Sequence, residues 1–87
     1  MVAGKVKMVY VYILYSSSLG KFYVGSTDNI ERRIDRHNSG RSNFTSKGIP
    51  WKLIAKIECK NRSEAMGLEI QIKKRGIKRY LQDNHLV

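Results

Sequence analysis

The sequence predicts an α+β domain in which a small three-stranded antiparallel sheet is flanked by helices. Two short apolar stretches separated by a turn-forming segment indicate a β-hairpin, and a third apolar stretch lies between two segments with helical periodicity. The hydrophobic content of 41% is enough for one small core. The expected order of elements is therefore β-β-α-β-α-α. We expect a flexible leader at residues 1–7 and a single domain over residues 8–87.

The hairpin is the first predicted element. Met8–Tyr15 is a run of β-branched, aromatic and aliphatic residues, which is typical of a strand. Ser16–Gly20 supplies turn-forming residues, and Gly20 is free to adopt a positive φ. The short run Phe22–Val24 then predicts an antiparallel partner strand.

A helix is expected directly after the hairpin. Asp28 is a suitable N-cap, and Glu31 three residues later completes a capping box. The helix would run to about Asn38, with Gly40 as its C-terminal stop. The polar and basic segment 40–50 predicts a loop that is long enough to have a functional role.

The third strand is predicted over Trp51–Cys59, where apolar and charged residues alternate. Leu53, Ala55 and Ile57 are two residues apart and are expected to share one face. The intervening residues are mostly charged and are expected to form the more polar face.

The last long helix is predicted from a second capping box, Asn61 with Glu64, and runs to about Lys74. A shorter helix is expected over Ile77–Gln82, after the glycine that follows the basic helix end. The long helix has an apolar stripe that consists of Ala65, Leu68 and Ile72, flanked by Met66 and Ile70.

Composition narrows the function classes. The chain carries 17 Lys and Arg residues against seven Asp and Glu, a net charge of +10, which favours a polyanion partner such as DNA. A membrane surface is a weaker expectation, because the basic segment 70–81 offers no aromatic anchor except Tyr80. The lone Cys59 excludes an internal disulfide and a Cys-based zinc site. No apolar run reaches about 18 residues, and no signal-peptide core precedes Lys5, so we expect an intracellular, cytoplasmic protein that can associate with the nucleoid.

Four side chains near the hairpin are candidates for chemistry. Tyr12 lies on the same strand face as Tyr10, and Tyr23 lies on the partner strand. Arg33 and His37 are one helical turn apart just after the hairpin. Strand tyrosines often merely pack, and an Arg and His pair on a helix is most often a solvated face. The residues alone leave both interpretations open.

Glu69 is the most unusual of the seven acidic residues. It lies between two apolar residues, at the border of the predicted apolar stripe of the long helix. One interpretation is an i,i+4 ion pair with Lys73 in the favourable order. The other is a lone carboxylate that holds a hard cation such as Mg²⁺, which keeps most of its waters.

Together these residues form a pattern that resembles the GIY-YIG nuclease domain, and in particular its small stand-alone members. The matching motifs are Val11-Tyr12-Ile13, Tyr23-Val24-Gly25-Ser26, Arg33 with His37, and Glu69. The likeness covers Val9–Leu81 and includes the run of residues 31–40 and the Arg-Ser-Glu-Ala start of the last long helix. The glycine of the first motif is absent, since Tyr10 or Val11 stands there depending on the alignment. Asn84 is a poorly placed counterpart of the family's C-terminal Asn.

The resemblance implies a role for each matched residue. Tyr12 would act as the general base, and Tyr23 would orient the attacking water or touch the scissile phosphate. Arg33 would stabilise charge on the phosphate, and His37 would assist proton transfer. Glu69 would bind the single metal ion, Mg²⁺ or Mn²⁺. Phosphodiester hydrolysis needs such groups because negative charge builds up on the phosphoryl oxygens in its transition state.

The resemblance, with the basic charge, predicts a divalent-metal-dependent endonuclease that hydrolyses DNA phosphodiester bonds. We expect structure-dependent or weakly sequence-specific cleavage, with DNA repair or recombination as the setting, and a homodimer or partner protein that supplies specificity. The basic residues expected to grip the DNA backbone are Arg41, Lys47, Lys73, Lys74, Arg75, Lys78 and Arg79.

Two alternatives remain open at this level. A nucleic-acid-binding module of the same fold with little or no catalysis would carry the same charge. A basic protein-interaction module that docks onto an acidic partner would do so as well.

Overall fold

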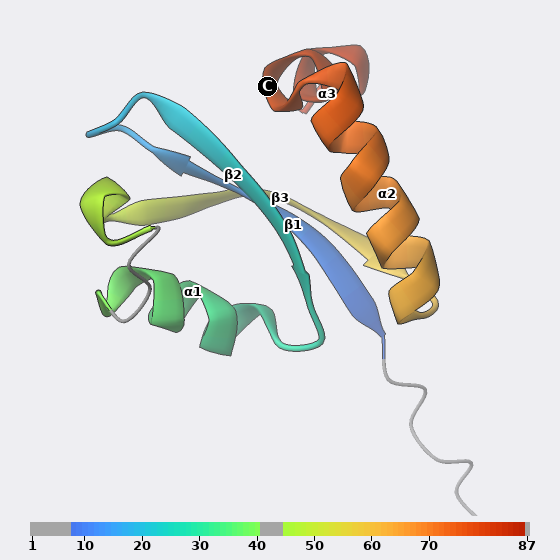
Figure 1. Cartoon of the computed structure of the whole chain (residues 1–87), viewed down its shortest axis with the longest axis horizontal. Coiled ribbons are helices and arrows are strands. Elements are labelled where there is room, and N and C mark those ends of the chain that lie inside the picture. Colours follow the sequence, from blue (N-terminus) through green and yellow to red (C-terminus); the bar gives the residue numbers. More distant parts are fainter. Residues whose placement is uncertain (1–7, 41–44, 87) are drawn as a thin grey trace, which may run out of the picture.

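The computed structural model describes residues 8–40 and 45–86. Its elements are β1 (Val9–Ser16), β2 (Lys21–Thr27), α1 (Ile30–Asn38), the 3₁₀ helix η1 (Ser46–Gly48), β3 (Trp51–Cys59), α2 (Arg62–Arg75) and α3 (Ile77–Asp83). The three strands form one antiparallel sheet in the order β2-β1-β3. Figure 1 shows α1 on one side of the sheet and α2 with α3 on the other. The predicted α+β class, the antiparallel sheet and the order of elements are confirmed.

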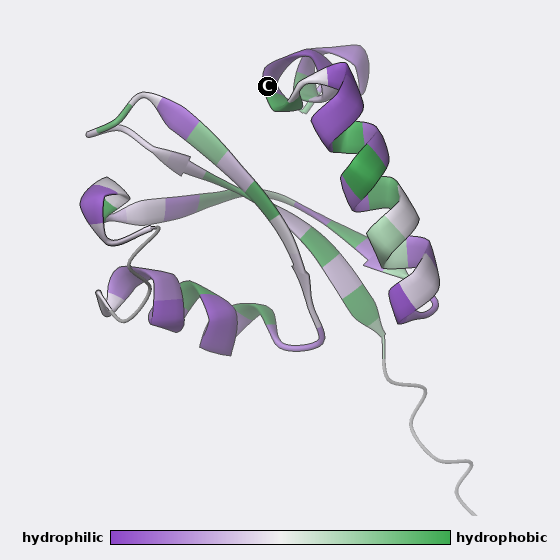
Figure 2. Cartoon of the chain, in the orientation of Figure 1, coloured by the Kyte–Doolittle hydropathy of each residue, from purple (hydrophilic) through white to green (hydrophobic). Residues whose placement is uncertain are grey.

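The central strand β1 is buried on both faces because helices cover both sides of the sheet. Its alternate residues therefore contribute to two separate clusters. The cluster beneath α2 and α3 consists of Val9, Val11, Ile13, Val24, Ala55, Cys59, Ala65, Ile72 and Leu81. The cluster beneath α1 consists of Tyr12, Leu14 and Trp51, with Tyr23, Ile30, Ile34, Ile49 and Leu53 packed against it. Figure 2 shows apolar residues along the strands and polar residues over much of α1.

The strand β2 is longer than predicted. Residues 25–27 were expected to turn into the helix, but Gly25, Ser26 and Thr27 continue the ladder opposite Tyr12, Val11 and Tyr10. The prediction was wrong because pairing with a buried central strand outweighs the low strand propensity of glycine. The longer strand places Gly25 directly beside Tyr12.

The helix α1 also begins one residue later than predicted. Its N-cap is Asn29, whose side-chain oxygen accepts a hydrogen bond from the backbone N–H of Arg32, so the expected Asp28 and Glu31 capping box is wrong. Thr27 causes the shift, because its hydroxyl accepts a hydrogen bond from the Asn29 N–H and holds the tight turn after β2. The predicted end at Asn38 is confirmed, and Gly40 follows with a φ of 80°.

A β-bulge in β3 changes the faces of this strand. Ala55 pairs with Ile13, whereas Leu53 pairs with the next residue, Leu14, so Ile54 is the extra residue between them. Leu53 consequently packs beneath α1, while Ile54 and Ala55 both lie on the side of α2. The prediction that Leu53 shares a face with Ala55 was therefore wrong.

The two C-terminal helices agree with prediction at their starts. Asn61 accepts a hydrogen bond from the Glu64 N–H, although the Glu64 carboxylate bonds to the Lys60 N–H instead of closing on Asn61. Gly76, with a φ of 96°, makes the corner between α2 and α3. None of the helices described is long and apolar enough to cross a membrane.

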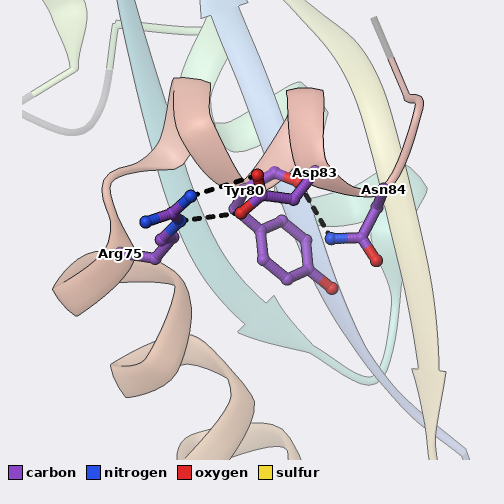
Figure 3. A network of polar contacts seen from close by, with 4 residues as sticks. All are labelled: Arg75, Tyr80, Asp83 and Asn84. Atoms are coloured by element: carbon purple, nitrogen blue, oxygen red, sulfur yellow. Dashed lines mark hydrogen bonds and ion pairs between the residues drawn. The ribbon is translucent and has the colours of Figure 1, made fainter.

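The corner between α2 and α3 is held by an exposed ion pair (Figure 3). The Arg75 guanidinium donates two hydrogen bonds to the Asp83 carboxylate, with Nε–Oδ2 and Nη2–Oδ1 distances of 2.7 and 3.1 Å. The Asn84 amide donates to the Tyr80 carbonyl at 2.9 Å. Arg75, expected as a DNA contact, therefore has a structural partner within the chain.

Candidate active site

The Tyr12 phenol occupies space that Gly25 leaves open. The two residues are neighbours across β1 and β2, and a Cβ atom at position 25 would lie 2.6 Å from the Tyr12 Oη. The Tyr12 side chain is fully buried beneath α1. The missing side chain of Gly25 is therefore a requirement for the position of the phenol.

Replacement of Gly25 by alanine is expected to lower the free energy of unfolding by about 1–3 kcal/mol, because the added methyl group overlaps the phenol. Urea denaturation of the full chain measures this change. The matched control is Gly67→Ala, since Gly67 is an exposed helical residue with no atom within 4 Å of the place that a methyl group would take. This control is expected to leave stability unchanged or to raise it by up to about 1 kcal/mol. Equal stability of the Gly25→Ala variant and the native chain would contradict the packing argument.

A chain of hydrogen bonds connects the phenol to the buried residues beneath α1. The Tyr12 Oη lies 3.0 Å from Nε2 of His37, and Nδ1 of His37 lies 3.0 Å from Oγ1 of Thr45. His37 and Thr45 are only 5% and 1% exposed. Because both imidazole nitrogens have partners, the ring has a fixed orientation.

The pKa values of the two titratable groups set the direction of these bonds. Burial, and next the guanidinium groups of Arg33 and Arg36, lower the pKa of His37 below its usual 6.5, so the ring is neutral at pH 7. Burial raises the pKa of Tyr12 to about 12, and the phenol stays protonated. The phenol therefore donates to Nε2, and the Nδ1–H donates to the Thr45 hydroxyl.

Three groups besides burial act on the Tyr12 phenol. The nearby Tyr23 phenol and the Glu69 carboxylate raise its pKa, while the Arg33 guanidinium lowers it through charge and hydrogen bonding. Tyr12 on β1 thus lies within electrostatic range of Arg33 on α1 and of Glu69 on α2. Since burial outweighs Arg33, the phenol needs a proton acceptor before it can act as a base.

The Tyr23 ring packs against the imidazole of His37. Its centroid lies 4.8 Å from that of the imidazole in an edge-to-face arrangement, and 6.3 Å from that of the Tyr12 ring. The Tyr23 side chain is half-buried, whereas Tyr12 is fully buried. The structure therefore brings both motif tyrosines, the histidine and the arginine of α1 into one site.

Glu69 approaches from α2, and its side chain is 22% exposed. Its carboxylate accepts a hydrogen bond from the Lys73 ammonium at 2.9 Å, which is the predicted i,i+4 pair. The same carboxylate acts on the pKa of Tyr12. Glu69 therefore pairs with Lys73 and also lies within electrostatic range of Tyr12.

The available ligands fit a hard cation held by a single carboxylate. Among residues 8–40 and 45–86, there is no group of three or more His, Cys, Asp or Glu side chains that could hold a metal ion. Mg²⁺ is often bound by one carboxylate, with water and substrate oxygens as its other ligands, and Glu69 offers this arrangement. A zinc site, which needs three or four protein ligands, does not fit.

The basic residues expected to contact DNA occupy several positions. Lys73 and Arg75 are engaged with Glu69 and Asp83, as described above. Arg41 lies outside the described residues. The remaining basic residues are exposed, and they are Lys47 before β3, Lys74 at the end of α2, and Lys78 and Arg79 on α3.

Sequence reasoning did not identify the residues that hold the surroundings of His37 in place. Asn38 holds the start of β3, since its amide accepts from the Trp51 N–H at 2.6 Å and donates to the Trp51 carbonyl at 3.1 Å. The Trp51 indole N–H in turn donates to the Thr45 carbonyl at 2.7 Å. A side chain at Gly48 would overlap the Trp51 ring. Thr45 gave no signal of this role, because it lies in a segment that was predicted as a polar loop.

The arrangement of these residues agrees with what comparison with known proteins finds. A family model described as the GIY-YIG catalytic domain matches residues 8–81. The chain belongs to the GIY-YIG family. The family is one of nucleases, and its members generally use divalent metal ions. The match spans every element from β1 to most of α3.

Several small bacterial proteins are similar to this GIY-YIG chain. The "UPF0213 protein YsiG" of Lactococcus lactis is 36% identical over 61 residues, which cover 69% of this chain and 58% of that protein. The "UPF0213 protein BH0048" of Halalkalibacterium halodurans is 37% identical over 65 residues, covering 74% and 68%. The matched segment thus spans about three fifths to two thirds of these relatives.

A solved structure supports the fold. The solution NMR structure of the UPF0213 protein BH0048 from Bacillus halodurans aligns with 91% of this chain and 84% of its own, at a TM-score of 0.56 and 32% identity. The GIY-YIG sheet and helices are therefore shared with a small protein of similar size.

Proposed function

We propose that this protein is a divalent-metal-dependent endonuclease that hydrolyses phosphodiester bonds in DNA. The observation that carries the proposal is the buried hydrogen-bond chain from Tyr12 through His37 to Thr45, with Arg33 and Glu69 within electrostatic range of its phenol end. A buried tyrosine paired with a histidine of lowered pKa, beside a charged arginine, is an arrangement that is enriched at functional sites. The net charge of +10 supports a polyanionic substrate.

The chain offers a proton path for an attacking water. Because the Tyr12 side chain is fully buried, this path requires a local opening that admits the water. As the water attacks phosphorus, its proton would pass to the Tyr12 oxygen, and the phenol proton would pass to Nε2 of His37. The resulting imidazolium is stabilised by the Thr45 hydroxyl, which accepts the Nδ1–H. The phenol oxygen thus needs no free phenolate at neutral pH, which its pKa of about 12 would make rare.

The remaining residues stabilise charge. Arg33 presents a fixed guanidinium where negative charge develops on the phosphoryl oxygens. The half-buried Tyr23 phenol faces the same region and would orient the water or the phosphate. A Mg²⁺ or Mn²⁺ ion held by Glu69 would neutralise charge on the scissile phosphate and the departing 3′-oxygen.

One experiment tests the proposed activity directly. Purified full-length protein is incubated with supercoiled plasmid, branched DNA and single-stranded DNA, in Mg²⁺, in Mn²⁺ and in EDTA. We expect nicking or branch cleavage that requires the metal ion, with weak sequence preference and a preference among DNA structures. Absence of cleavage on all three substrates in both metals would overturn the proposal. We further propose DNA repair or recombination as the setting, with self-association or a partner protein supplying specificity.

A second candidate function is DNA binding without cleavage. The Glu69 carboxylate is paired with Lys73, and the pKa of Tyr12 is raised. Both observations favour a site in which the carboxylate and the phenol take no part in catalysis. This candidate predicts tight, salt-sensitive DNA binding with no metal-dependent product.

Thr45 provides a test of the proton path. Thr45→Val keeps the side-chain shape but removes the acceptor for the His37 Nδ1–H, so we expect kcat to fall about tenfold to a hundredfold with little change in KM. Cleavage by the native chain should rise with pH through a midpoint below 6.5, as His37 loses its proton. In Thr45→Val this midpoint should move to lower pH, because the imidazolium loses a hydrogen bond.

Thr45→Ser is the matched control, since it keeps the hydroxyl and should retain most of the cleavage rate. A purely structural role for Thr45 would instead lower the thermal stability of Thr45→Val without moving the midpoint of the pH profile. That result would remove Thr45 from the proton path.

A further inference from the structure

A second surface of the molecule has the composition of a nucleic-acid site. Phe22, Tyr15 and Lys52 lie side by side across β2, β1 and β3, as the strand register shows. The rings of Tyr15 and Phe22 contact each other, with centroids 4.9 Å apart and planes tilted by 49°. Phe22 packs against the cluster beneath α2 and α3, so this aromatic pair faces away from Tyr12 and α1.

Helices α2 and α3 do not cover this end of the sheet. Tyr15 and Phe22 remain half-buried, and with Gly20, Ile54 and Lys78 they line an open groove of about 350 Å³. Figure 1 shows the turn between β1 and β2 extending away from α2 and α3. A volume in the range of about 300–1,000 Å³ is usual for small-molecule sites. The groove is therefore large enough to take a planar group such as a base.

The charge around the aromatic pair is positive. Lys78 lines the groove from α3, and Lys52 is exposed beside Tyr15. None of the residues that line the groove in the described part of the chain carries a carboxylate. Ring faces next to lysines match a partner that combines flat apolar rings with negative charge. Single-stranded nucleic acid is such a partner, because its unpaired bases stack and its phosphates face cations.

We propose that Tyr15 and Phe22 form a stacking surface for unpaired nucleotides, with Lys52 and Lys78 facing the flanking phosphates. Bases inside a duplex are already stacked, so this surface selects single-stranded segments. A second copy of this chain is a poorer occupant of this groove than nucleic acid, because the lysines beside the aromatic pair would face another domain of net charge +10.

The stacking surface connects with the candidate active site through β2. Phe22 and Tyr23 are consecutive residues of this edge strand and point to opposite faces of the sheet. One DNA strand can therefore pass around the edge and reach both. This inference rests on the proposed function and makes it more specific, since it names a substrate with unpaired nucleotides next to the cut.

Binding without cleavage tests the stacking surface. The full chain is titrated in EDTA with fluorescent oligothymidylate and, separately, with a blunt duplex, and fluorescence anisotropy reports the Kd. Tyr15→Leu and Phe22→Leu keep apolar bulk but remove the ring face. Each should raise the Kd for oligothymidylate about fivefold to tenfold, while the Kd for the duplex changes less than twofold.

Two control variants accompany these. Tyr15→Phe keeps the ring and should bind oligothymidylate like the native chain. Tyr10→Leu removes a tyrosine from the other face, where it stacks on Lys56, and should also leave the Kd unchanged. Because Phe22 contacts the core, its variant is compared only if its thermal unfolding midpoint stays close to that of the native chain. If the midpoint falls, the test rests on Tyr15→Leu, since Tyr15 is half-buried and lies outside this cluster.

Three results would overturn the proposal. One is an unchanged Kd for oligothymidylate in Tyr15→Leu. Another is an equal loss of duplex and single-strand binding, which would mean phosphate contact without stacking. The third is a concentration-dependent dimer in sedimentation that Tyr15→Leu abolishes, which would assign the groove to a second copy. Since the titrations contain no metal ion, they can fail while metal-dependent cleavage stands, and they can succeed where cleavage is absent.

Discussion

Replacing Tyr12 by phenylalanine is expected to reduce DNA cleavage by about a hundredfold or more while leaving the fold intact. In the proposed mechanism the phenol oxygen receives the proton of the attacking water, and a positioned general base contributes about 10²–10⁴ to a rate. Phenylalanine keeps the ring in its place beneath α1 and removes only the oxygen that contacts His37. Single-turnover cleavage of a labelled DNA substrate measures the effect.

The matched control is Tyr10→Phe. Tyr10 lies on the same face of β1 two residues away, where its ring contacts Lys56 and not His37. The control should cleave at the native rate. If Tyr12→Phe also cleaves at the native rate, the phenol is a packing residue, and the Tyr23 oxygen becomes the next candidate for the base.

Replacing Glu69 by glutamine is expected to lower the kcat of metal-dependent cleavage by a factor of about 10²–10³. The change keeps the shape of the side chain and removes the charge that, in the proposed function, would hold the cation. Because Glu69 is partly exposed and its ion pair with Lys73 lies at the surface, the free energy of unfolding should change by less than about 0.5 kcal/mol.

Metal binding provides a readout that does not depend on activity. Mn²⁺ titration followed by electron paramagnetic resonance should show weaker binding for Glu69→Gln than for the native chain. Glu58→Gln, an exposed acid on β3, is the control and should bind Mn²⁺ normally. Equal Mn²⁺ affinity and equal cleavage in Glu69→Gln would contradict the metal role, whatever the fold.

Much of the fold could be predicted from local patterns. The central strand, the third strand and the two C-terminal helices follow from apolar periodicity and from caps such as Asn61. The end of β2 could not be predicted, because Gly25 joins the sheet only through its pairing with Tyr12. The bulge at Ile54 was missed for the same reason, since register depends on the partner strand and not on the strand itself.

The candidate site was predictable to the extent that it consists of motif residues. Tyr12, Tyr23, Arg33, His37 and Glu69 were recognised by resemblance. The structure places Tyr12, Tyr23 and His37 in contact, and the charges of Arg33 and Glu69 act on the pKa of Tyr12. Thr45 could not be found this way, because its role depends on a turn that returns to His37. Neither could the pairing of Arg75 with Asp83, since residues eight apart on one continuous helix would lie about 12 Å apart along its axis, and these two meet only because of the Gly76 corner.

The contrast between buried and exposed site residues bears on how this family evolves. The Tyr12 ring, Gly25 and His37 fit together inside the core, so packing would still constrain these positions in a descendant that loses catalysis. Glu69 carries no such constraint, because its exposed ion pair contributes little to stability. Under the proposed function, loss of catalysis would therefore leave the tyrosine and glycine positions constrained by packing, whereas the acid at position 69 would be free to change.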